Sequence, residues 1–253
     1  MTLALITGAS GGIGRALATL HAKRGGDLIV TARRLPELET LARELKDAHG
    51  ATVTPVAADI GTQEGLATIL AATEGQEIDI LINNAGFGGR GRFVERSLAD
   101  DLNMVDVNIT AVMTLCHAIG TRMVARGQGR ILNVGSTAGM LPGPLQATYF
   151  ASKAFVNSFS QALDEEMRKD GVTVTVLAPG YVATDFAARA DLEGTPLTKG
   201  GSTPEAVAKV GYDAMMKGEL VAINEGQLKV ATRLLGLLPR RQVLKMARRM
   251  QSK

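Results

Sequence analysis

Short apolar runs recur along the chain, separated by longer segments in which apolar and polar residues repeat with a helical period. Seven runs are predicted strands, at residues 3–7, 27–31, 52–57, 78–83, 130–134, 172–178 and 220–223. Each run is almost continuously apolar, which is typical of parallel strands covered by helices on both faces. We therefore expect an α/β fold, a single Rossmann-like doubly wound parallel sheet of about seven strands flanked by helices.

Pro55 lies inside the third predicted strand. Because proline has no amide N–H to donate, it is confined to edge strands of a sheet. The third strand is an edge strand in the doubly wound order 3-2-1-4-5-6. The position of Pro55 therefore favours this strand order.

Two helices have clear start signals. Ser97 precedes an acid three residues later, and Thr203 precedes a proline at the first helical position. A further predicted helix carries an apolar stripe, which faces either the sheet or another subunit: Phe155, Phe159, Leu163 and Met167. The segment 189–203, rich in Gly, Thr and Pro, is long enough for a lid.

The composition suits a protein with a large core: 253 residues with 45% hydrophobic content. Cys116 is the single cysteine, so we expect a buried free thiol and a cytoplasmic protein. The chain begins with a predicted strand rather than a signal peptide, and we expect no membrane span. The three histidines are dispersed, so no metal site is predicted.

A glycine-rich turn joins the first strand to the first helix. Gly8, Gly12 and Gly14 allow a sharp turn and a close approach of the backbone to a pyrophosphate, with Ser10 and Ile13 in the same turn. The helix N-terminus that follows directs free N–H groups towards an anion. This placement predicts a dinucleotide site.

The end of the second strand indicates which dinucleotide is bound. A site for NAD usually has an acid here, whereas this chain has Arg33 and Arg34. A guanidinium can form two hydrogen bonds with a 2′-phosphate, so NADP(H) is favoured over NAD(H). The alternative is that both arginines are simply solvated surface residues.

Polar residues follow the third and fourth strands. Asp59 and Ile60 follow the third, and Asn83, Asn84, Ala85 and Gly86 follow the fourth. Ligands bind at the carboxyl ends of strands in such sheets. We expect the two asparagines mainly to tie the backbone together.

A polar trio follows the fifth strand: Ser136, Tyr149 and Lys153. Tyr149 and Lys153 are four residues apart in a predicted helix, so they share one face. Reducing a ketone requires a hydride on carbon and a proton on oxygen, and the pKa of a free phenol is too high for easy proton exchange. A nearby ammonium would lower the pKa of Tyr149, and Ser136 could bind the carbonyl oxygen. Asn108 could bind a water that links Lys153 to solvent.

With these motifs in this order, the chain resembles the classical short-chain dehydrogenases/reductases from Thr7 to about Glu225. The resemblance implies a catalytic tetrad of Asn108, Ser136, Tyr149 and Lys153. It further implies that Lys153 binds the nicotinamide ribose and that Asp59 contacts the adenine. The segment Pro179, Gly180, Val182 and Thr184 would line the nicotinamide.

The predicted activity is reversible NADP(H)-dependent reduction of a ketone or aldehyde to an alcohol. The alternative is a non-catalytic dinucleotide-binding regulator, which would not need Ser136, Tyr149 and Lys153. A sugar-nucleotide epimerase or dehydratase would need a larger C-terminal domain than the chain has after Tyr181. Candidate pocket residues suggest a partly apolar small-molecule substrate: Phe87, Met140, Leu141, Gln146, Tyr181 and Phe186.

The net charge of +3 conceals a basic tail. Residues 229–253 carry eight basic side chains and no acid, which leaves the rest of the chain at −5. We expect residues 1–228 to form the domain and 229–253 a two-faced extension, with Val243, Met246, Ala247 and Met250 on its apolar face. It could dock on the body or on a partner subunit, cover a lipophilic substrate, or contact anionic membrane peripherally. We expect a homodimer or homotetramer and no nucleic-acid binding.

Overall fold

A parallel sheet of seven strands organises the molecule. The computed structural model describes residues 2–198, 200–226 and 239–253. The strands are β1 (Leu3–Thr7), β2 (Asp27–Ala32), β3 (Val53–Ala57), β4 (Ile80–Asn83), β5 (Gly129–Val134), β6 (Val172–Leu177) and β7 (Val221–Ala222). Their order is β3-β2-β1-β4-β5-β6-β7, and every pair is parallel. The predicted fold class is confirmed, and so is the edge position of the strand that contains Pro55.

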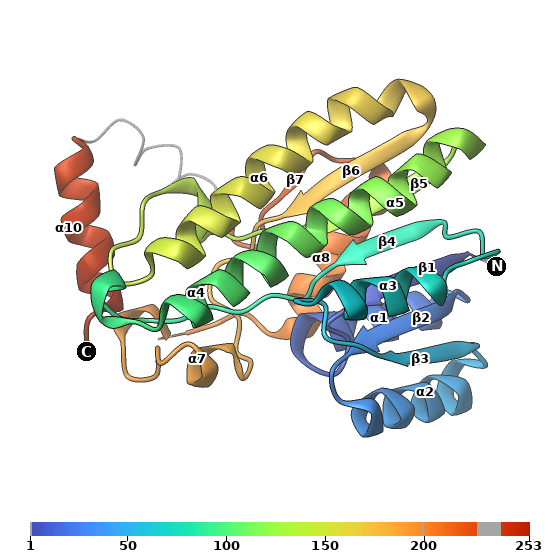
Figure 1. Ribbon diagram of the computed structural model, residues 1–253, viewed down its shortest axis with the longest axis horizontal. Coiled ribbons are helices and arrows are strands. Elements are labelled where there is room, and N and C mark those ends of the chain that lie inside the picture. The colour runs from blue at the N-terminus through green and yellow to red at the C-terminus, as the bar shows by residue number, and fades with distance from the viewer. Residues whose placement is uncertain (1, 199, 227–238) are drawn as a thin grey trace.

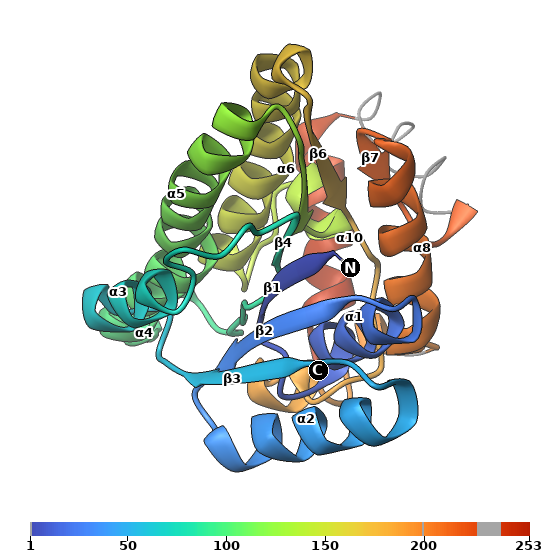
Figure 2. The same cartoon turned by 90° about the vertical axis from the view of Figure 1, so that its right-hand side faces the viewer.

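Helices cover both faces of the sheet (Figure 2). On one face lie α1 (Gly12–Lys23), α2 (Leu35–His49) and α8 (Pro204–Lys217). On the other lie α3 (Gln63–Ala71), α4 (Leu98–Val105), α5 (Ala111–Arg126) and α6 (Ala147–Met167). The short helix α7 (Phe186–Arg189) and the helix α10 (Arg240–Gln251) lie at the same end of the molecule (Figure 1).

Alternating strand residues supply the two halves of the core. Ala4 and Ile6 of β1 pack with the α1, α2 and α8 layer, whereas Leu5 packs with the layer of α3, α5 and α6. All three are fully buried. This explains why the strands are apolar throughout, because each face of the sheet is covered.

The start signals of two helices are confirmed. The hydroxyl of Ser97 accepts a hydrogen bond from the Asp100 N–H at the start of α4. That of Thr203 accepts one from the Ala206 N–H at the start of α8. Such caps satisfy amide groups that the first helical turn leaves unpaired.

Helices α4 and α5 form one continuous helical run joined by a π-helical turn, Asp106–Thr110. By length and average hydropathy alone, this run (Leu98–Arg126) could span a membrane, contrary to our expectation of no such segment. Part of its apolar surface belongs to the core: Ala111, Leu115 and Ile119 are fully buried against the sheet, whereas Leu98, Leu102 and Met113 are exposed. Packing within the domain therefore explains the apolar residues of α5 that face the sheet.

The apolar stripe on α6 is only partly buried. Phe155 and Phe159 stack with ring centroids 5.3 Å apart and are half-buried, whereas Met167 is buried in the core. The row that faces the sheet runs instead through Val156, Ser160 and Asp164. The stripe thus lies at the border between core and surface.

The C-terminal helix forms where the two-faced pattern predicted it, but its buried face differs. Val243, Ala247 and Gln251 are buried, while Met246 and Met250 are 49% and 44% exposed. The polar Gln251 faces inwards, where its side chain forms a hydrogen bond with Gln146 on the body of the protein. The apolar residues Leu234 to Leu238 lie outside the described residues.

Candidate active site

The glycine turn after β1 adopts a conformation that side chains would prevent. Gly8 and Gly12 have φ angles of +68° and +53°. A Cβ on Gly14 would lie 2.3 Å from the Gly8 carbonyl oxygen. Helix α1 begins here without a side-chain cap and without an acid in its first turn. Its first amide groups therefore remain available to a phosphate.

Asn84 holds this turn against β4. Its side-chain Nδ2 donates to the carbonyl oxygens of Thr7 and Gly8, at 2.9 and 3.2 Å. The Thr7 hydroxyl in turn accepts hydrogen bonds from the backbone N–H groups of Asn84 and Ala85, both at 3.0 Å. Asn83 is buried and donates to Asn133 Oδ1 at 2.9 Å. Both asparagines act structurally in this geometry.

The arginine pair lies beside the glycine turn. Arg33 and Arg34 are exposed, and Arg34 Nη2 lies 3.5 Å from Ser10 Oγ. Arg34 also pairs with Glu37, at 2.6 Å between Nε and Oε1. Cationic groups therefore border the turn on the side where β2 ends. Asp59 is exposed at the end of β3, where its carboxylate accepts a hydrogen bond from the Gly61 N–H.

The glycine turn, the start of α1 and the arginine pair form a cradle at the rim of the sheet. A loop after β6 closes the opposite side of this cradle. The Pro179 carbonyl accepts hydrogen bonds from the Thr137 N–H and hydroxyl, at 3.0 and 3.2 Å. Gly180 N–H donates to Asn224 Oδ1 at 3.3 Å. Further along, the Thr184 methyl lies 3.1 Å from the point where a Cβ on Gly12 would lie. This loop thus spans from the polar trio to the glycine turn, with Val182 buried between its ends.

Together these groups fit a nicotinamide dinucleotide. The cradle offers unpaired helix amides, glycines at the points of closest approach, and two cationic side chains. Gly86 is exposed beside it, while Ile13 and Ile60 are half-buried and pack against the two halves of the core. The sequence-predicted coenzyme residues are therefore brought to one rim of the sheet.

Lys153 is buried in the site. Its Nζ donates to the Val134 carbonyl at 2.8 Å. Burial lowers the pKa of Lys153 to about 8. Lys153 Nζ and Asn108 Oδ1 both approach Gly86, within 3.3 and 3.1 Å of the point where a Cβ would lie. A side chain at position 86 would therefore obstruct the space between them.

Tyr149 lies one helical turn before Lys153 on α6. Burial raises the pKa of the Tyr149 phenol to about 12, and the hydroxyl of Ser136 acts in the opposite direction. The expected lowering of this pKa by Lys153 is not found in this geometry: burial is the main cause of the shift, and Ser136, not Lys153, opposes it. A phenol with such a pKa stays protonated near neutral pH.

Ser136 is held from both sides. Its Oγ accepts a hydrogen bond from the Ala138 N–H at 3.1 Å and lies 3.4 Å from the Pro179 carbonyl. Its backbone carbonyl accepts a 2.9 Å hydrogen bond from Asn157 Nδ2. Asn157, on the same face of α6 as Lys153, was not predicted from the sequence. No local pattern marks it, because its partner Ser136 is brought to it by tertiary folding.

Asn108 lies in the π-helical turn between α4 and α5. Its side chain is fully engaged: Oδ1 accepts from the Phe87 N–H at 3.1 Å, and Nδ2 donates to the Phe87 carbonyl and to Ser152 Oγ, both at 3.0 Å. π-Helical turns recur at functional sites. This one ties the loop after β4 to the helix that carries Tyr149.

The candidate pocket residues separate into two groups. Phe186 lies against Tyr149, with ring centroids 5.3 Å apart, and the point where a Gly88 Cβ would lie is within 3.4 Å of both Tyr149 and Gln146. Met140 and Leu141 instead line a cavity of about 550 Å³ that α10 borders with Arg240 and Leu244. Tyr149 and Ser136 do not line this cavity.

Cys116 takes no part in the site. Cys116 is buried as expected, and burial raises the pKa of its thiol to about 12. Among the described residues, no cluster of three or more His, Cys, Asp or Glu side chains could hold a metal ion.

Comparisons with known proteins agree with this geometry. The family model for short chain dehydrogenases matches residues 2–193. The chain is 33% identical to a Sphingobium yanoikuyae short-chain dehydrogenase solved in complex with NADPH, covering 100% of this chain and 98% of that one, with a TM-score of 0.86.

Two further similarities cover most of the chain. A bulky-bulky ketone specific alcohol dehydrogenase from Comamonas testosteroni is 31% identical, with coverage of 100% and 97% and a TM-score of 0.82. A 3-oxoacyl-(acyl-carrier-protein) reductase of Vibrio cholerae is 31% identical over 90% of this chain and 98% of its own length. The match to the two solved structures includes the region of α10.

Proposed function

The chain belongs to the short-chain dehydrogenase family, and from this premise we propose that it catalyses the reversible NADP(H)-dependent reduction of a ketone or aldehyde to an alcohol. The observation that supports this most is the convergence of Tyr149, Ser136 and Lys153 beside an uncapped helix N-terminus with a glycine turn. The NADPH bound to the Sphingobium yanoikuyae relative supports the coenzyme. We propose a partly apolar substrate and a cytoplasmic homodimer or homotetramer.

NADPH, when bound, would supply the hydride, and the residues of the chain control charge and protons around the carbonyl oxygen. Tyr149, protonated at neutral pH, donates its proton to the oxygen as negative charge develops there. The hydroxyl of Ser136 donates a long hydrogen bond of 3.4 Å to the Pro179 carbonyl. It can exchange this weak bond for one to the substrate oxygen. In this proposal the buried ammonium of Lys153 stabilises the phenolate that forms during the reaction, although it does not shift the pKa of the resting phenol, and Asn108 fixes the loop that borders Lys153.

The experiment is hydride transfer by Tyr149→Phe. This variant keeps the aromatic ring but lacks the hydroxyl that donates the proton. We therefore expect kcat for ketone reduction to fall at least about 100-fold. NADPH binding, followed by fluorescence titration, should be retained. A regulator without catalytic activity would bind NADPH but reduce no member of a ketone and aldehyde panel, and Tyr149→Phe turnover equal to the parent would refute the assigned role.

The same proposal has a pH signature. Because burial lowers the pKa of Lys153 to about 8, the ammonium is present below that pH and is lost as the pH rises through it. Reductive kcat/KM should therefore decline above about pH 8. A rate that stays level through pH 10 would show that the charge of Lys153 is not required.

A further inference from the structure

The C-terminal helix brings a buried polar side chain to the candidate site. Gln251, the last residue of α10, is 1% exposed. Its Oε1 accepts a 2.9 Å hydrogen bond from Nε2 of Gln146, which is 2% exposed and precedes α6. Gln146 lies three residues before Tyr149. Residues 105 positions apart thus form a buried amide pair next to the proposed proton donor.

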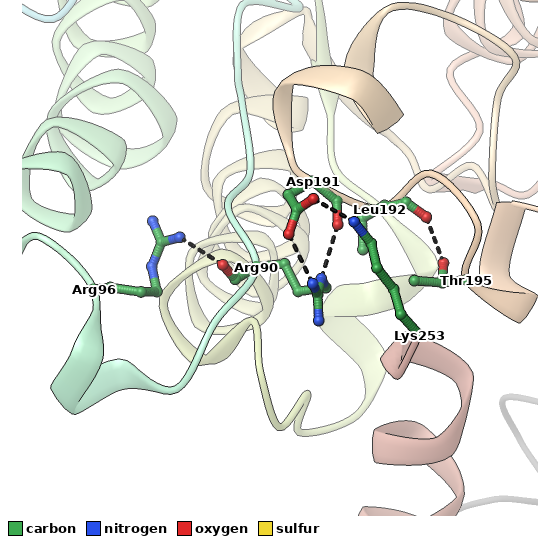
Figure 3. Close-up of polar contacts among 6 residues, drawn as sticks. All are labelled: Arg90, Arg96, Asp191, Leu192, Thr195 and Lys253. Atoms are coloured by element: carbon green, nitrogen blue, oxygen red, sulfur yellow. Dashed lines mark hydrogen bonds and ion pairs between the residues drawn. The ribbon is translucent and has the colours of Figure 1, made fainter.

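Ion pairs fasten the end of α10 to the two loops around the site (Figure 3). Lys253 Nζ lies 2.5 Å from Asp191 Oδ1, and Asp191 Oδ2 lies 2.7 Å from Arg90 Nη2. Arg90 Nε also donates to the Asp191 backbone carbonyl at 2.8 Å. The loop after β4, the segment after α7 and the C-terminal end of α10 are therefore joined at one point.

A fixed hydrogen-bond direction orients the Gln146 amide. Gln251 Nε2 donates to the Ala247 carbonyl at 3.3 Å, so Gln251 must present its oxygen to Gln146. Gln146 in turn must present Nε2 to that oxygen, because the opposite orientation would place two acceptors face to face. The Oε1 of Gln146 is therefore directed away from α10.

This oxygen is buried and has no hydrogen-bond partner among the described residues. It lies 3.4 Å from the point where a Cβ on Gly88 would lie, and Tyr149 Cδ2 lies 3.2 Å from the same point. The preceding residue, Leu145, has a φ of +72° and is held by a 2.8 Å hydrogen bond from the Gly91 N–H. Backbone strain and an unpaired acceptor both recur where a ligand is bound.

We propose that Gln146 Oε1, oriented by Gln251, accepts a hydrogen bond from the substrate. This inference rests on the proposed function and specifies its substrate class: because Gln146 Oε1 and the Tyr149 ring approach the same point, the substrate is a carbonyl compound with a hydroxyl group close to the carbonyl, for which an α-hydroxy ketone is the probe. Such a donor satisfies the buried acceptor, which an analogue without it leaves unpaired. Gln251 is then a positioning residue for substrate selection.

The test compares three ketones that differ only at that position: 2-hydroxyacetophenone, 2-methoxyacetophenone and acetophenone. With NADPH, kcat/KM of the parent should be at least about tenfold higher for the hydroxyl compound than for either analogue. Gln146→Leu should abolish this preference. Gln251→Leu should reduce it below about threefold, because the Gln146 amide is then free to rotate.

Two variants serve as matched controls. Gln251→Glu keeps an acceptor for Gln146 Nε2 and should keep the preference, whereas Gln251→Leu does not. Lys253→Ala removes the ion pair with Asp191 that follows α10 but leaves the amide pair of Gln251 and Gln146 intact. This variant should also keep the preference for the hydroxyl compound. Each preference is a ratio within one variant, so a general loss of activity does not alter it.

The possible failures can be told apart. If the parent reduces the ketones with no preference for the hydroxyl compound, or if Gln251→Leu keeps the preference, the inference is wrong and the proposed function stands. If the parent reduces none of the three and no other carbonyl compound, the proposed function is wrong and the inference falls with it.

Discussion

At the level of single residues, we propose that Arg33 and Arg34 select the coenzyme. Both are exposed at the end of β2, and the Arg34 guanidinium lies near Ser10 of the glycine turn. The double substitution Arg33→Asp with Arg34→Ala should raise KM for NADPH at least about tenfold more than KM for NADH. The reason is that the hydrogen bonds from the guanidinium groups to the 2′-phosphate are lost. Steady-state kinetics with both coenzymes checks this, and an unchanged preference would contradict it.

Single residues were predictable where backbone geometry demanded them. The glycines at 8, 12 and 14 followed from the need for a tight turn, and the structure shows why a Cβ would clash there. Asn157 and Gln251 could not be predicted, because their partners Ser136 and Gln146 are brought to them only by tertiary folding. Gln251 was concealed further, since a hydropathy pattern assigns a buried face to apolar residues such as Met246.

At the level of elements, a buried carboxylate helps to hold α6 to the sheet. Asp164 is 4% exposed, accepts a hydrogen bond from the Val174 N–H of β6 at 2.8 Å, and pairs with Arg168 through both oxygens. Asp164→Ala leaves the strand amide without its partner and should lower the free energy of unfolding by about 3 kcal/mol. Urea denaturation measures this, and the exposed Asp170→Ala should change stability by less than about 0.5 kcal/mol.

The elements themselves were predicted well, since their patterns depend on local period. The predicted bounds of β1 are those observed, and β3 was placed at the sheet edge from Pro55 alone. The π-helical turn at Asp106–Thr110 was not expected, because no residue type marks a change from four-residue to five-residue hydrogen bonding. It interrupts an otherwise regular helix at Asn108, whose side chain bonds to Phe87 and Ser152.

At the level of the whole molecule, charge is concentrated on α10. The basic side chains Arg241, Lys245, Arg248 and Arg249 are exposed, beside the partly exposed Met246 and Met250. If this face contacts anionic membrane, as the sequence allows, Lys245→Glu with Arg248→Glu and Arg249→Glu should reduce binding to phosphatidylserine vesicles at least about tenfold at low salt.

A control for this prediction keeps the same change in net charge. It places three glutamates at exposed lysines of the body, Lys23, Lys46 and Lys169. Vesicle sedimentation should then resemble the parent. Equal loss in both variants would mean that binding responds to total charge and not to α10.

The position of Lys253 also affects how the protein can be handled. The two chain ends lie at opposite ends of the molecule (Figure 1), and Lys253 is paired with Asp191 beside the candidate site. A peptide fused after Lys253 would begin beside that ion pair, which lies two residues after Gln251. Affinity tags and surface attachment therefore belong at the amino end, where Leu3 begins the inner strand β1 far from the chemistry.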